Sequence, residues 1–427
     1  MVQEKVADRH PADEAELLEE LTEKQALSRL RQLDPEEAAQ ALEAMEPWQS
    51  SRLLEELKRG VKSEIIGSME PDDSADILQE LPTEERDELL STLTKRRQDQ
   101  LGRLLGYPED SAGGLMSPEV VALRPDLTVE EAIEELRRQG ERLERANYAY
   151  VTDGENVLLG VLPLRELAFK DPHTQLESIM NKDVNTISPD VDGEEVARAF
   201  DKYDYLALPV ANGEGRLLGV VTVDDVIDLM RQEDTEDMLG MVGVFEAREE
   251  SIFTPWYLSL RHRLPWLFVN LGTALLAALV VGLFQGTIER IAVLAVFMPV
   301  VAGQGGNSGA QTVAILIRSI ALGDIEKGHR LIALSKESKL GVIHGLSIGL
   351  TLGLITFFWQ GDLTLALVVG ASMILSMVTA GIAGVLMPLG LKALGLDPAL
   401  SSNIWMTTIT DVSSFFFLLG LASWILL

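Results

Sequence analysis

The last apolar stretch of the chain contains a single carboxylate, Asp411. Residues 404–427 are apolar and long enough to cross a bilayer as a helix, which takes about 20 residues. A charge at mid-membrane depth costs roughly 2.5–3.5 kcal/mol on insertion scales, so such residues usually face a bundle interior or an aqueous path. By their spacing, Asn403, Thr407 and Ser414 share one helix face with Asp411. This pattern favours a cation path in which Asp411 is the acidic binding site. A seam of interhelical hydrogen bonds around a protonated Asp411 is the alternative.

A second polar constellation lies inside an earlier apolar segment. Residues 298–312 read MPVVAGQGGNSGAQT, with four glycines and with Asn307 and Gln311 among them. Unwound backbone at membrane depth persists only where it is buried in protein or lines water. Small residues such as Gly and Ser also let helices pack closely. The two interpretations are compatible, and we expect Asn307 and Gln311 to line the same path as Asp411.

The C-terminal part of the sequence predicts a membrane domain. It contains five apolar segments, at residues 264–284, 288–316, 340–359, 363–386 and 404–427. Basic residues gather before the first segment, between the second and third, and between the fourth and fifth. The positive-inside rule therefore places the N-terminus in the cytoplasm, and five crossings place the C-terminus outside the cell (inner) membrane. Because an odd number of helices cannot divide into two inverted repeats, a path on the axis of a homodimer is attractive.

Charge is distributed unevenly along the 427 residues. The first 250 residues carry 59 of the 66 acidic and 27 of the 36 basic residues, a net charge of −32, whereas the remainder carries +2. Such an acidic soluble half argues against nucleic-acid binding, which needs a basic surface. It favours an interaction with cations, or serves solubility alone. The chain has no cysteine, which excludes disulfides and thiolate metal sites.

Residues 1–105 are predicted to form helices only. Pro35, Pro47 and Pro71 each begin a similar phrase, and their separations are 12 and 24 residues. Short helices repeated at a fixed period cannot bury their apolar faces alone, so we expect a small solenoid. The acidic residues in the first helical turns are usually only partners of the helix dipole. Alternatively, Asp72 and Asp76, one turn apart, share a divalent cation with another domain.

Residues 106–170 and 171–231 form a second, different repeat. MSPEVVALRPDLTVEEA from Met116 is similar to MNKDVNTISPDVDGEEV from Met180, and LLGVLPLREL from Leu158 is similar to LLGVVTVDDV from Leu217. Each copy predicts a strand, a Pro-Asp turn, a helix, two short strands around a Gly-containing turn and another helix.

The two copies together resemble a tandem pair of cystathionine-β-synthase (CBS) domains. The stretch ALPVANGEGRLLGVVTVDDVIDL, from Ala207, is close to the usual second half of such a domain. This resemblance implies a regulatory module that binds ATP or another adenine nucleotide through a Thr-x-x-Asp motif. The second copy has this motif as Thr222 and Asp225, whereas the first has Pro163 and Glu166. The same Thr and Asp are equally suited to capping a helix.

Residues 232–260 are expected to form a helix that connects the soluble half to the membrane domain. Acidic residues are dense between positions 224 and 237, and the sequence then becomes amphipathic. A run of charges is usually a solvated helix face. Clusters of carboxylates also suit hard cations such as Mg²⁺ and Ca²⁺. No Ca²⁺-binding loop of the EF-hand form is present.

Three motifs extend a family resemblance over essentially the whole chain. They are GGNSGAQ at residues 305–311, LDPALSSN at 396–403 and TTITDVSS at 407–414. With the helical N domain and the CBS pair, they resemble the MgtE family of magnesium transporters. The resemblance implies a homodimer with a pore between subunits, Mg²⁺ bound at Asp411, and Asn403 and Glu289 along the outer or middle path. Residues 261–427 would be the pore domain, and the connecting helix would be the plug that closes it from the cytoplasm.

A gating hypothesis follows from the charge and the resemblance together. Two soluble halves in a dimer repel each other, and bound Mg²⁺ would offset this repulsion and favour a compact, closed state. We therefore expect a Mg²⁺-selective, channel-like importer of the bacterial cell membrane with negative feedback by cytoplasmic Mg²⁺. The candidate regulatory ligands are Asp72, Asp76, Asp192, Glu194, Asp204, Asp225, Asp228, Glu233, Glu236 and Asp237.

The expected fold class is multi-domain: an all-α N-terminal solenoid, an α/β tandem CBS pair and an all-α transmembrane domain of five helices. One alternative function is transport of another divalent cation such as Co²⁺, although the path is poor in His and Cys, which softer metals prefer. Another is a non-conducting, membrane-anchored nucleotide sensor, which would tolerate Asp411→Asn. No phosphate loop or catalytic motif stands out, so we do not expect an enzyme.

Overall fold

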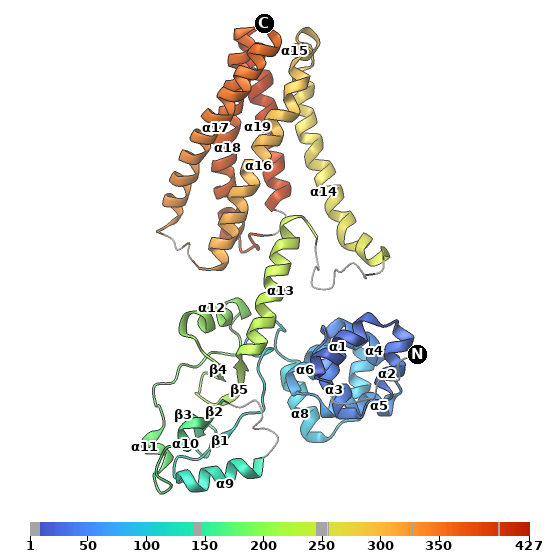
Figure 1. The fold of residues 1–427 in the computed structure, drawn as a ribbon, viewed down its shortest axis with the longest axis vertical. Helices are drawn as coiled ribbons and strands as arrows, with labels where there is room; N and C mark the ends of the chain where they lie inside the picture. The colour runs from blue at the N-terminus through green and yellow to red at the C-terminus, as the bar shows by residue number, and fades with distance from the viewer. Residues whose placement is uncertain are drawn as a thin grey trace. The chain divides into compact units, whose positions relative to one another are not determined.

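The computed structural model describes residues 9–139, 147–244, 254, 256–323, 325, 328–399 and 402–427. The chain folds into two compact units, Met1–Met230 and Arg231–Leu427 (Figure 1). The first unit contains a helical repeat followed by a pair of small α/β domains. The second unit consists of helices only in its described part. The expected fold class is thereby confirmed.

The helical repeat is more regular than its sequence suggests. Its helices begin every 12 residues, whether or not the first residue is proline. Proline suits the first helical position because its missing N–H would have no partner there. The helices are α1 (Pro11–Glu20), α2 (Glu23–Leu30), α3 (Pro35–Glu43), α4 (Pro47–Glu55), α5 (Arg59–Ser68), α6 (Pro71–Glu80), α7 (Thr83–Leu90) and α8 (Lys95–Leu104).

The repeat stacks because the same position is buried in six successive units. Each helix packs against the helix two places further along, as in α1 on α3 and α4 on α6. Ser50 Oγ donates a hydrogen bond to Leu42 O (2.8 Å), and the equivalent Ser74 Oγ, 24 residues later, donates to Ile66 O (3.3 Å). A column of buried aliphatic residues recurs at the same period: Leu18, Leu30, Leu42, Leu54, Ile66 and Leu78. The predicted solenoid is therefore present.

The first α/β domain contains a three-stranded sheet. Strand β1 (Ala122–Leu123) pairs in parallel with β2 (Tyr148–Thr152), which pairs antiparallel with β3 (Leu158–Pro163). Helix α9 (Val129–Gln139) precedes β2, and the short helices α10 (Leu164–Leu167) and α11 (Leu176–Ile179) follow β3.

The second α/β domain repeats this plan. Helix α12 (Gly193–Tyr203) precedes the antiparallel strands β4 (Ala207–Ala211) and β5 (Leu217–Thr222). The expected first strand of this copy is reduced to a single parallel bridge between Ile187 and Val210. The two copies meet through their hairpin turns, where Leu217 N donates to Asn156 O (2.9 Å) and Leu158 N donates to Gly215 O (3.0 Å).

The connecting helix begins earlier than its sequence pattern suggests. Helix α13 (Val223–Met241) starts directly after β5 and runs without interruption past residue 232, where the sequence placed its start. Its first part is therefore the last helix of the second α/β domain. The end of the expected segment, residues 245–253 and 255, lies outside the described residues.

The second unit is a bundle of long helices. They are α14 (Trp256–Leu283), α15 (Gln285–Arg290), α16 (Leu294–Ala321), α17 (Arg330–Gln360), α18 (Leu363–Ala393) and α19 (Ser402–Ile425). Among the described residues, α14, α17, α18 and α19 are long and apolar enough to cross a membrane. Helix α16 is as long as α14, but its middle carries the Gly-, Asn- and Gln-rich motif. Each of the five apolar segments thus lies largely within one long helix.

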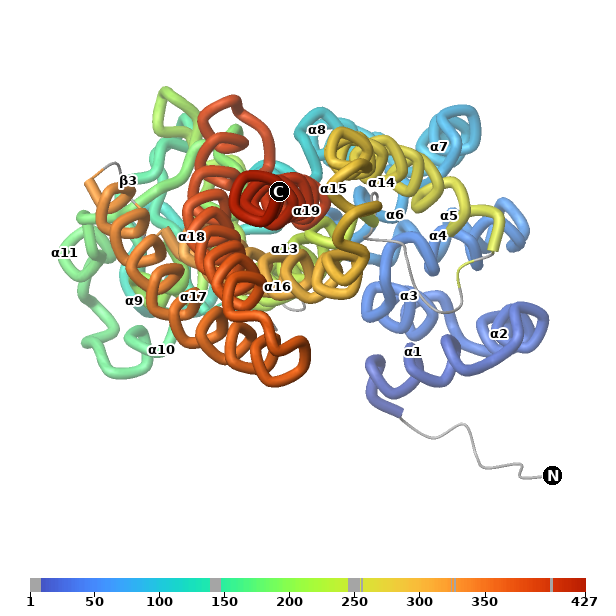
Figure 2. Tube along the Cα trace, turned by 90° about the horizontal axis from the view of Figure 1, so that it is seen from above, coloured from blue at the N-terminus to red at the C-terminus, as the bar shows by residue number. Residues whose placement is uncertain are grey.

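Helix α19 lies between α14 and α18 in this bundle. It packs against α14, α16 and α18, whereas α17 packs on α18 (Figure 2). The contact between α17 and α18 relies on glycine: a Cβ on Gly345 would lie 3.0 Å from Ile374 Cα, and one on Gly349 would lie 2.7 Å from Gly370 O. Such close backbone contact is typical of helices that associate in lipid, where the hydrophobic effect does not hold them together.

Candidate cation sites

The first candidate site is an acidic turn at the start of α6. Oxygen atoms of Glu70, Asp72 and Asp73 lie within 4.8 Å of one another. Pro71 starts the helix directly after Glu70, and the Glu70 N–H donates to Glu43 Oε1 (2.7 Å). The helix N-terminus favours negative charge, which explains why acids are tolerated here. Three converging carboxylates match the oxygen ligands that hard divalent cations prefer.

The acidic turn lacks an internal partner for one of its oxygens. Asp72 is 8% exposed, and its Oδ1 is buried without a hydrogen-bond partner. Burial raises the pKa of Asp72 well above its usual range, and the carboxylates of Asp225 and Glu70 raise it further. Burial also raises the pKa of Asp73, with Asp72 and Glu43 adding to the effect. A bound cation would reverse these penalties, because it favours the ionised carboxylates.

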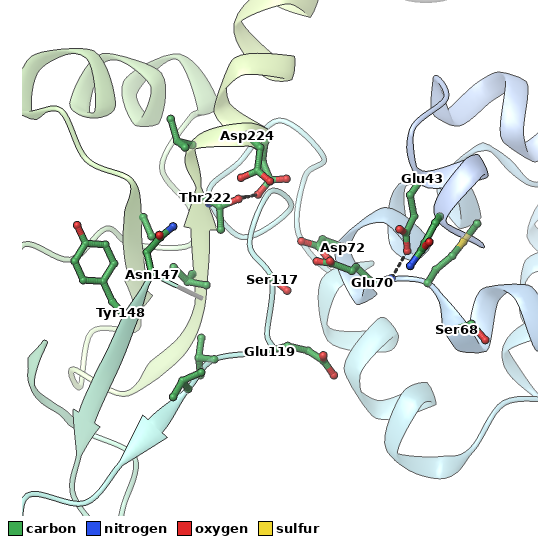
Figure 3. Close-up of a pocket in the computed structure, with 18 of the residues that line it drawn as sticks. Glu43, Ser68, Glu70, Asp72, Ser117, Glu119, Asn147, Tyr148, Thr222 and Asp224 are labelled. Atoms are coloured by element: carbon green, nitrogen blue, oxygen red, sulfur yellow. Dashed lines mark hydrogen bonds between the residues drawn. The ribbon is translucent and has the colours of Figure 1, made fainter. Parts of the chain in front are cut away.

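A cavity of about 750 Å³ lies next to the acidic turn. Figure 3 shows Glu70 and Asp72 on one side of this cavity and Thr222 and Asp224 of the second α/β domain on the other. Acidic side chains from both sides line it: Glu36, Glu43, Glu70, Asp72, Glu119, Asp224 and Asp225. The solenoid and the pair of α/β domains therefore both contribute acidic side chains to this one cavity of the first unit.

Asp225 is the acid on the α/β side with the strongest perturbation. Burial raises its pKa to about 6, and Asp224 and Glu70 add to the shift, whereas a hydrogen bond from Thr222 opposes it. Thr222 Oγ1 donates to Asp225 Oδ2 (2.5 Å), and Thr222 N donates to the same oxygen (3.3 Å). The two residues of the Thr-x-x-Asp motif are thus bonded to each other at the start of α13. This is the helix-capping arrangement, and the nucleotide role of Thr222 and Asp225 stays a prediction.

Two more of the expected ligands are Asp76 and Asp228. Burial raises the pKa of Asp76, and the charges of Glu109 and Asp225 add to it. Asp72, Asp76 and Asp225 therefore belong to one electrostatically coupled group. Burial also raises the pKa of Glu46, with Asp228 contributing, so Asp228 lies near the start of α4.

Three expected ligands are used locally instead. Asp192 is the N-cap of α12, where its Oδ1 accepts from Glu194 N (2.9 Å). Glu194 pairs with Arg198 one turn along the helix. Asp204 ends the same helix in the left-handed conformation, with φ of 53°. All three are exposed, and the structure does not bring them into the acidic cluster, because helix capping and pairing occupy them.

The remaining three expected ligands lie in the second unit. Glu233, Glu236 and Asp237 are on the last turns of α13. Burial raises the pKa of Asp397, in the connection between α18 and α19, and the charge of Glu236 adds to it. Asp397 was not predicted as a site residue, although the LDPALSSN motif contains it. Its Oδ1 accepts from Ala399 N (2.8 Å), which helps to hold this connection.

Asp411 lies half-exposed in the middle of α19. Asn403 and Thr407 are also partly exposed, and Thr407 Oγ1 donates to Asn403 O (2.7 Å) within the helix. Ser414 differs from its expected lining position: it is fully buried, and its hydroxyl bonds to Ser376 of α18. The polar stripe is therefore accessible at Asn403, Thr407 and Asp411, whereas Ser414 contributes to helix packing.

The glycine-rich motif of α16 packs against α19 without unwinding. The helix is continuous from Leu294 to Ala321, so the glycines do not unwind the backbone. A Cβ on Gly305 would lie 2.5 Å from Ser376 Oγ, and one on Gly309 would lie 2.3 Å from Met406 Cε. Asn307 and Gln311, one turn apart on another face, are exposed. Close packing thus explains the glycines, while the amides remain available to a path.

Glu289 lies outside the long helices. It is exposed on the short helix α15, where Gln285 Nε2 donates to its Oε1 (3.0 Å). Helix α15 packs on α19, and it lies at the same end of the bundle as the C-terminus (Figure 1).

A second carboxylate of the bundle was missed by the sequence pattern. Glu337 is 9% exposed on α17, and its Oε2 accepts from Thr312 Oγ1 of α16 (3.1 Å). The sequence pattern places the start of the third apolar segment at residue 340, whereas helix α17 begins at Arg330. The missed signal is a lone acid one turn before an apolar run.

Family comparisons assign each part of the chain. Residues 298–421 match the family model described as MgtE, a divalent cation transporter. Residues 9–110 match the MgtE intracellular N domain, and residues 112–171 and 176–232 match the CBS domain.

Whole proteins and solved structures give the same assignment. The Magnesium transporter MgtE of Thermus thermophilus is 38% identical over 77% of this chain and 73% of its own length, and that of Bacillus subtilis is 32% identical over 75% and 70%. A crystal structure of the cytosolic domain of the Mg²⁺ channel MgtE in complex with ATP has a TM-score of 0.50 and 40% identity over 52% of this chain and 91% of that chain. This chain therefore belongs to the MgtE family of divalent cation transporters.

Proposed function

We propose that this protein is a Mg²⁺-selective, channel-like importer of the bacterial cell membrane. The observation that carries the proposal is Asp411, a half-exposed carboxylate in the middle of the apolar helix α19. Relatives named as magnesium transporters support the choice of ion. Mg²⁺ gives up its water reluctantly, so Asn403, Thr407, Asn307 and Gln311 would contact its hydration shell. Asp411 would supply the charge that admits a cation.

The working assembly in this proposal is a homodimer with the path between subunits. Asn307 and Gln311 are exposed on α16, and polar side chains facing lipid are unfavourable. A second copy would cover these amides and place two Asp411 carboxylates around one path. The positive-inside rule puts the N-terminus in the cytoplasm and the C-terminus outside, with Glu289 at the outer end.

The regulatory part of the proposal uses the acidic turn of the first unit. Glu70, Asp72 and Asp73 with Asp76 and Asp225 would bind cytoplasmic Mg²⁺ and so offset the repulsion across the cavity. Cation binding would favour the compact, closed state, because it stabilises only the arrangement that brings the carboxylates together. This gives negative feedback by the transported ion. Asp228, Glu233, Glu236 and Asp237 would contribute along α13.

ATP or another adenine nucleotide is the proposed second regulator. The relative solved in complex with ATP supports this choice. In this chain the CBS pair retains Thr222 and Asp225 beside the cavity, and the volume of about 750 Å³ is ample for a nucleotide.

The experiment that tests the transport proposal is Mg²⁺ influx into liposomes that contain a Mg²⁺-sensitive dye. We expect influx with the wild type and none with Asp411→Asn, which removes the charge and keeps the shape. A matched control is Asp362→Asn, because Asp362 caps α18 through Thr364 N and asparagine caps equally well. Influx that survives in Asp411→Asn would remove Asp411 from the path. Influx in none of the folded proteins would favour the non-conducting sensor, and equal influx of Co²⁺ would contradict Mg²⁺ selectivity.

A further inference from the structure

Arg97 is a buried cation beside the acidic turn. It lies on α8, is 9% exposed, and uses one nitrogen, Nη2, for three hydrogen bonds. Nη2 donates to Ile66 O (3.2 Å), to Ser74 Oγ (2.8 Å) and to Met69 O. Burying an arginine is costly unless its charge and its donors are compensated, so its position calls for an explanation.

The three acceptors bracket the candidate metal ligands. Ile66 and Met69 lie at the end of α5, and Ser74 lies in the first turn of α6. The segment between them carries Glu70, Asp72 and Asp73. Arg97 therefore ties together both ends of the turn that presents the carboxylates.

Arg97 compensates the charge of the turn without bonding to Asp72 Oδ1. The three Nη2 bonds go to two backbone carbonyls and a hydroxyl, and Asp72 Oδ1 has no hydrogen-bond partner. Burial lowers the pKa of Arg97, and the nearby charges of Glu119, Asp72, Glu43 and Glu70 oppose that effect. Of the described residues that line the cavity, Arg97 alone is basic. The positive charge of Arg97 thus lies beside the same cavity as the carboxylates, while Asp72 Oδ1 stays available to a cation.

We propose that Arg97 is an internal counter-cation that competes electrostatically with the divalent cation and sets the concentration at which the acidic turn binds it. This inference rests on the proposed regulatory site at Glu70, Asp72 and Asp73. Without a metal ion, Arg97 limits the repulsion among the carboxylates and keeps the turn folded. When a divalent cation enters, the same charge repels it and weakens binding. The acidic turn would in this way bind Mg²⁺ at high concentrations of the ion and not at low concentrations.

The test measures hydrogen–deuterium exchange of residues 66–76 in the full-length protein during a Mg²⁺ titration. Arg97→Gln removes the charge but keeps a polar side chain at this position. We expect faster exchange of this segment without Mg²⁺, recovery at saturating Mg²⁺, and a midpoint about fivefold lower than in the wild type. Arg97→Lys keeps the charge and should keep the wild-type midpoint.

A matched control is Arg29→Gln, which removes another arginine of the solenoid, one whose side chain is 18% exposed. Arg29 pairs with Glu14 and does not line the cavity, so its loss should leave the midpoint unchanged. An unchanged or raised midpoint in Arg97→Gln, or a midpoint lowered equally in Arg97→Lys, overturns the proposal. Fast exchange of Arg97→Gln even at saturating Mg²⁺ would also overturn it, because Arg97 would then be purely structural. If the wild type gains no protection from Mg²⁺, the regulatory site itself fails and this inference fails with it.

Discussion

The acidic turn of the first unit and Asp411 of the second are both carboxylate sites, but their surroundings differ. In the acidic turn, carboxylate oxygens converge within 4.8 Å, and Asp72 is buried. Asp411 is the one acid on α19 and is half-exposed on a helix of apolar and hydroxyl residues. A crowded site binds a cation strongly and holds it, whereas a conducting site must also release the ion. The difference suggests that the same ligand type serves regulation in one unit and passage in the other.

The largest effect we expect is on transport, and it tests whether the two carboxylate sites have separate roles. Asp411→Asn should abolish Mg²⁺ influx, whereas Asp72→Asn should leave influx intact and remove its inhibition by Mg²⁺ on the side of the soluble unit. The reason is that our proposal places Asp72 in the regulatory cluster alone. Dye-loaded liposomes with Mg²⁺ varied on each side measure both properties. A loss of influx in folded Asp72→Asn would show that the two sites do not have separate roles.

The two units also differ in how their helices are held together, and Leu54→Ala tests the solenoid. Leu54 is fully buried in the column of aliphatic residues that recurs every 12 positions. Its truncation should lower the free energy of unfolding of the solenoid by roughly 2–5 kcal/mol, from lost transfer energy and the cavity left behind. Urea denaturation of the full-length protein, followed by circular dichroism, measures this. The exposed Glu56→Ala, two residues further along, is the control and should change little.

Gly349→Ala tests the contrasting packing of the bundle. An added Cβ at Gly349 would meet Gly370 O at 2.7 Å, so α17 and α18 must separate. Overpacking of this kind typically costs about 1–3 kcal/mol. We expect a lower temperature at which the purified protein loses its monodisperse gel-filtration peak. Gly282→Ala on α14 meets nothing within 4 Å and should behave as the wild type. Equal stability of both variants would contradict glycine-dependent packing.

The smallest expected effect is a pH dependence of the regulatory site. The pKa of Asp225 rises from 3.8 to about 6 on folding, so the folded protein holds this proton between those values. Without a metal ion, the stability of the first unit should therefore fall as pH rises from about 4 to 6 and be highest below that window. Mg²⁺ requires the ionised form, so its affinity should rise over the same range.

Proton competition at one group of pKa about 6 makes the Mg²⁺ midpoint about tenfold higher at pH 5 than at pH 7.5. Hydrogen exchange of residues 66–76 at the two pH values measures this shift. In Asp225→Asn the shift should shrink, because the titrating group is gone. A midpoint independent of pH in the wild type would remove Asp225 from the cation site.

Much of the architecture follows from periodicity. Prolines 12 and 24 residues apart predict the solenoid, and the structure adds units at Glu23 and Lys95 that begin without proline but keep the 12-residue period. The apolar runs predict the helices of the bundle, but Glu337 was missed because α17 extends beyond its most apolar part. Asp192, Glu194 and Asp204 show the limit for sites: acids in a row predict a cluster, yet local capping and pairing can occupy each one.

The sequence by itself determined the helical repeat, the α/β repeat, the family and the acid at the centre of the last helix. These depend on local spacing, because side chains 12 residues apart in a solenoid or four apart in a helix meet the same environment. Only the tertiary structure decided which carboxylates share a site. Asp72 and Asp225 are far apart in the sequence, and their coupling arises where the solenoid and the second α/β domain face one cavity. Burial there, which no local pattern encodes, raises their pKa values and leaves Asp72 Oδ1 without a partner.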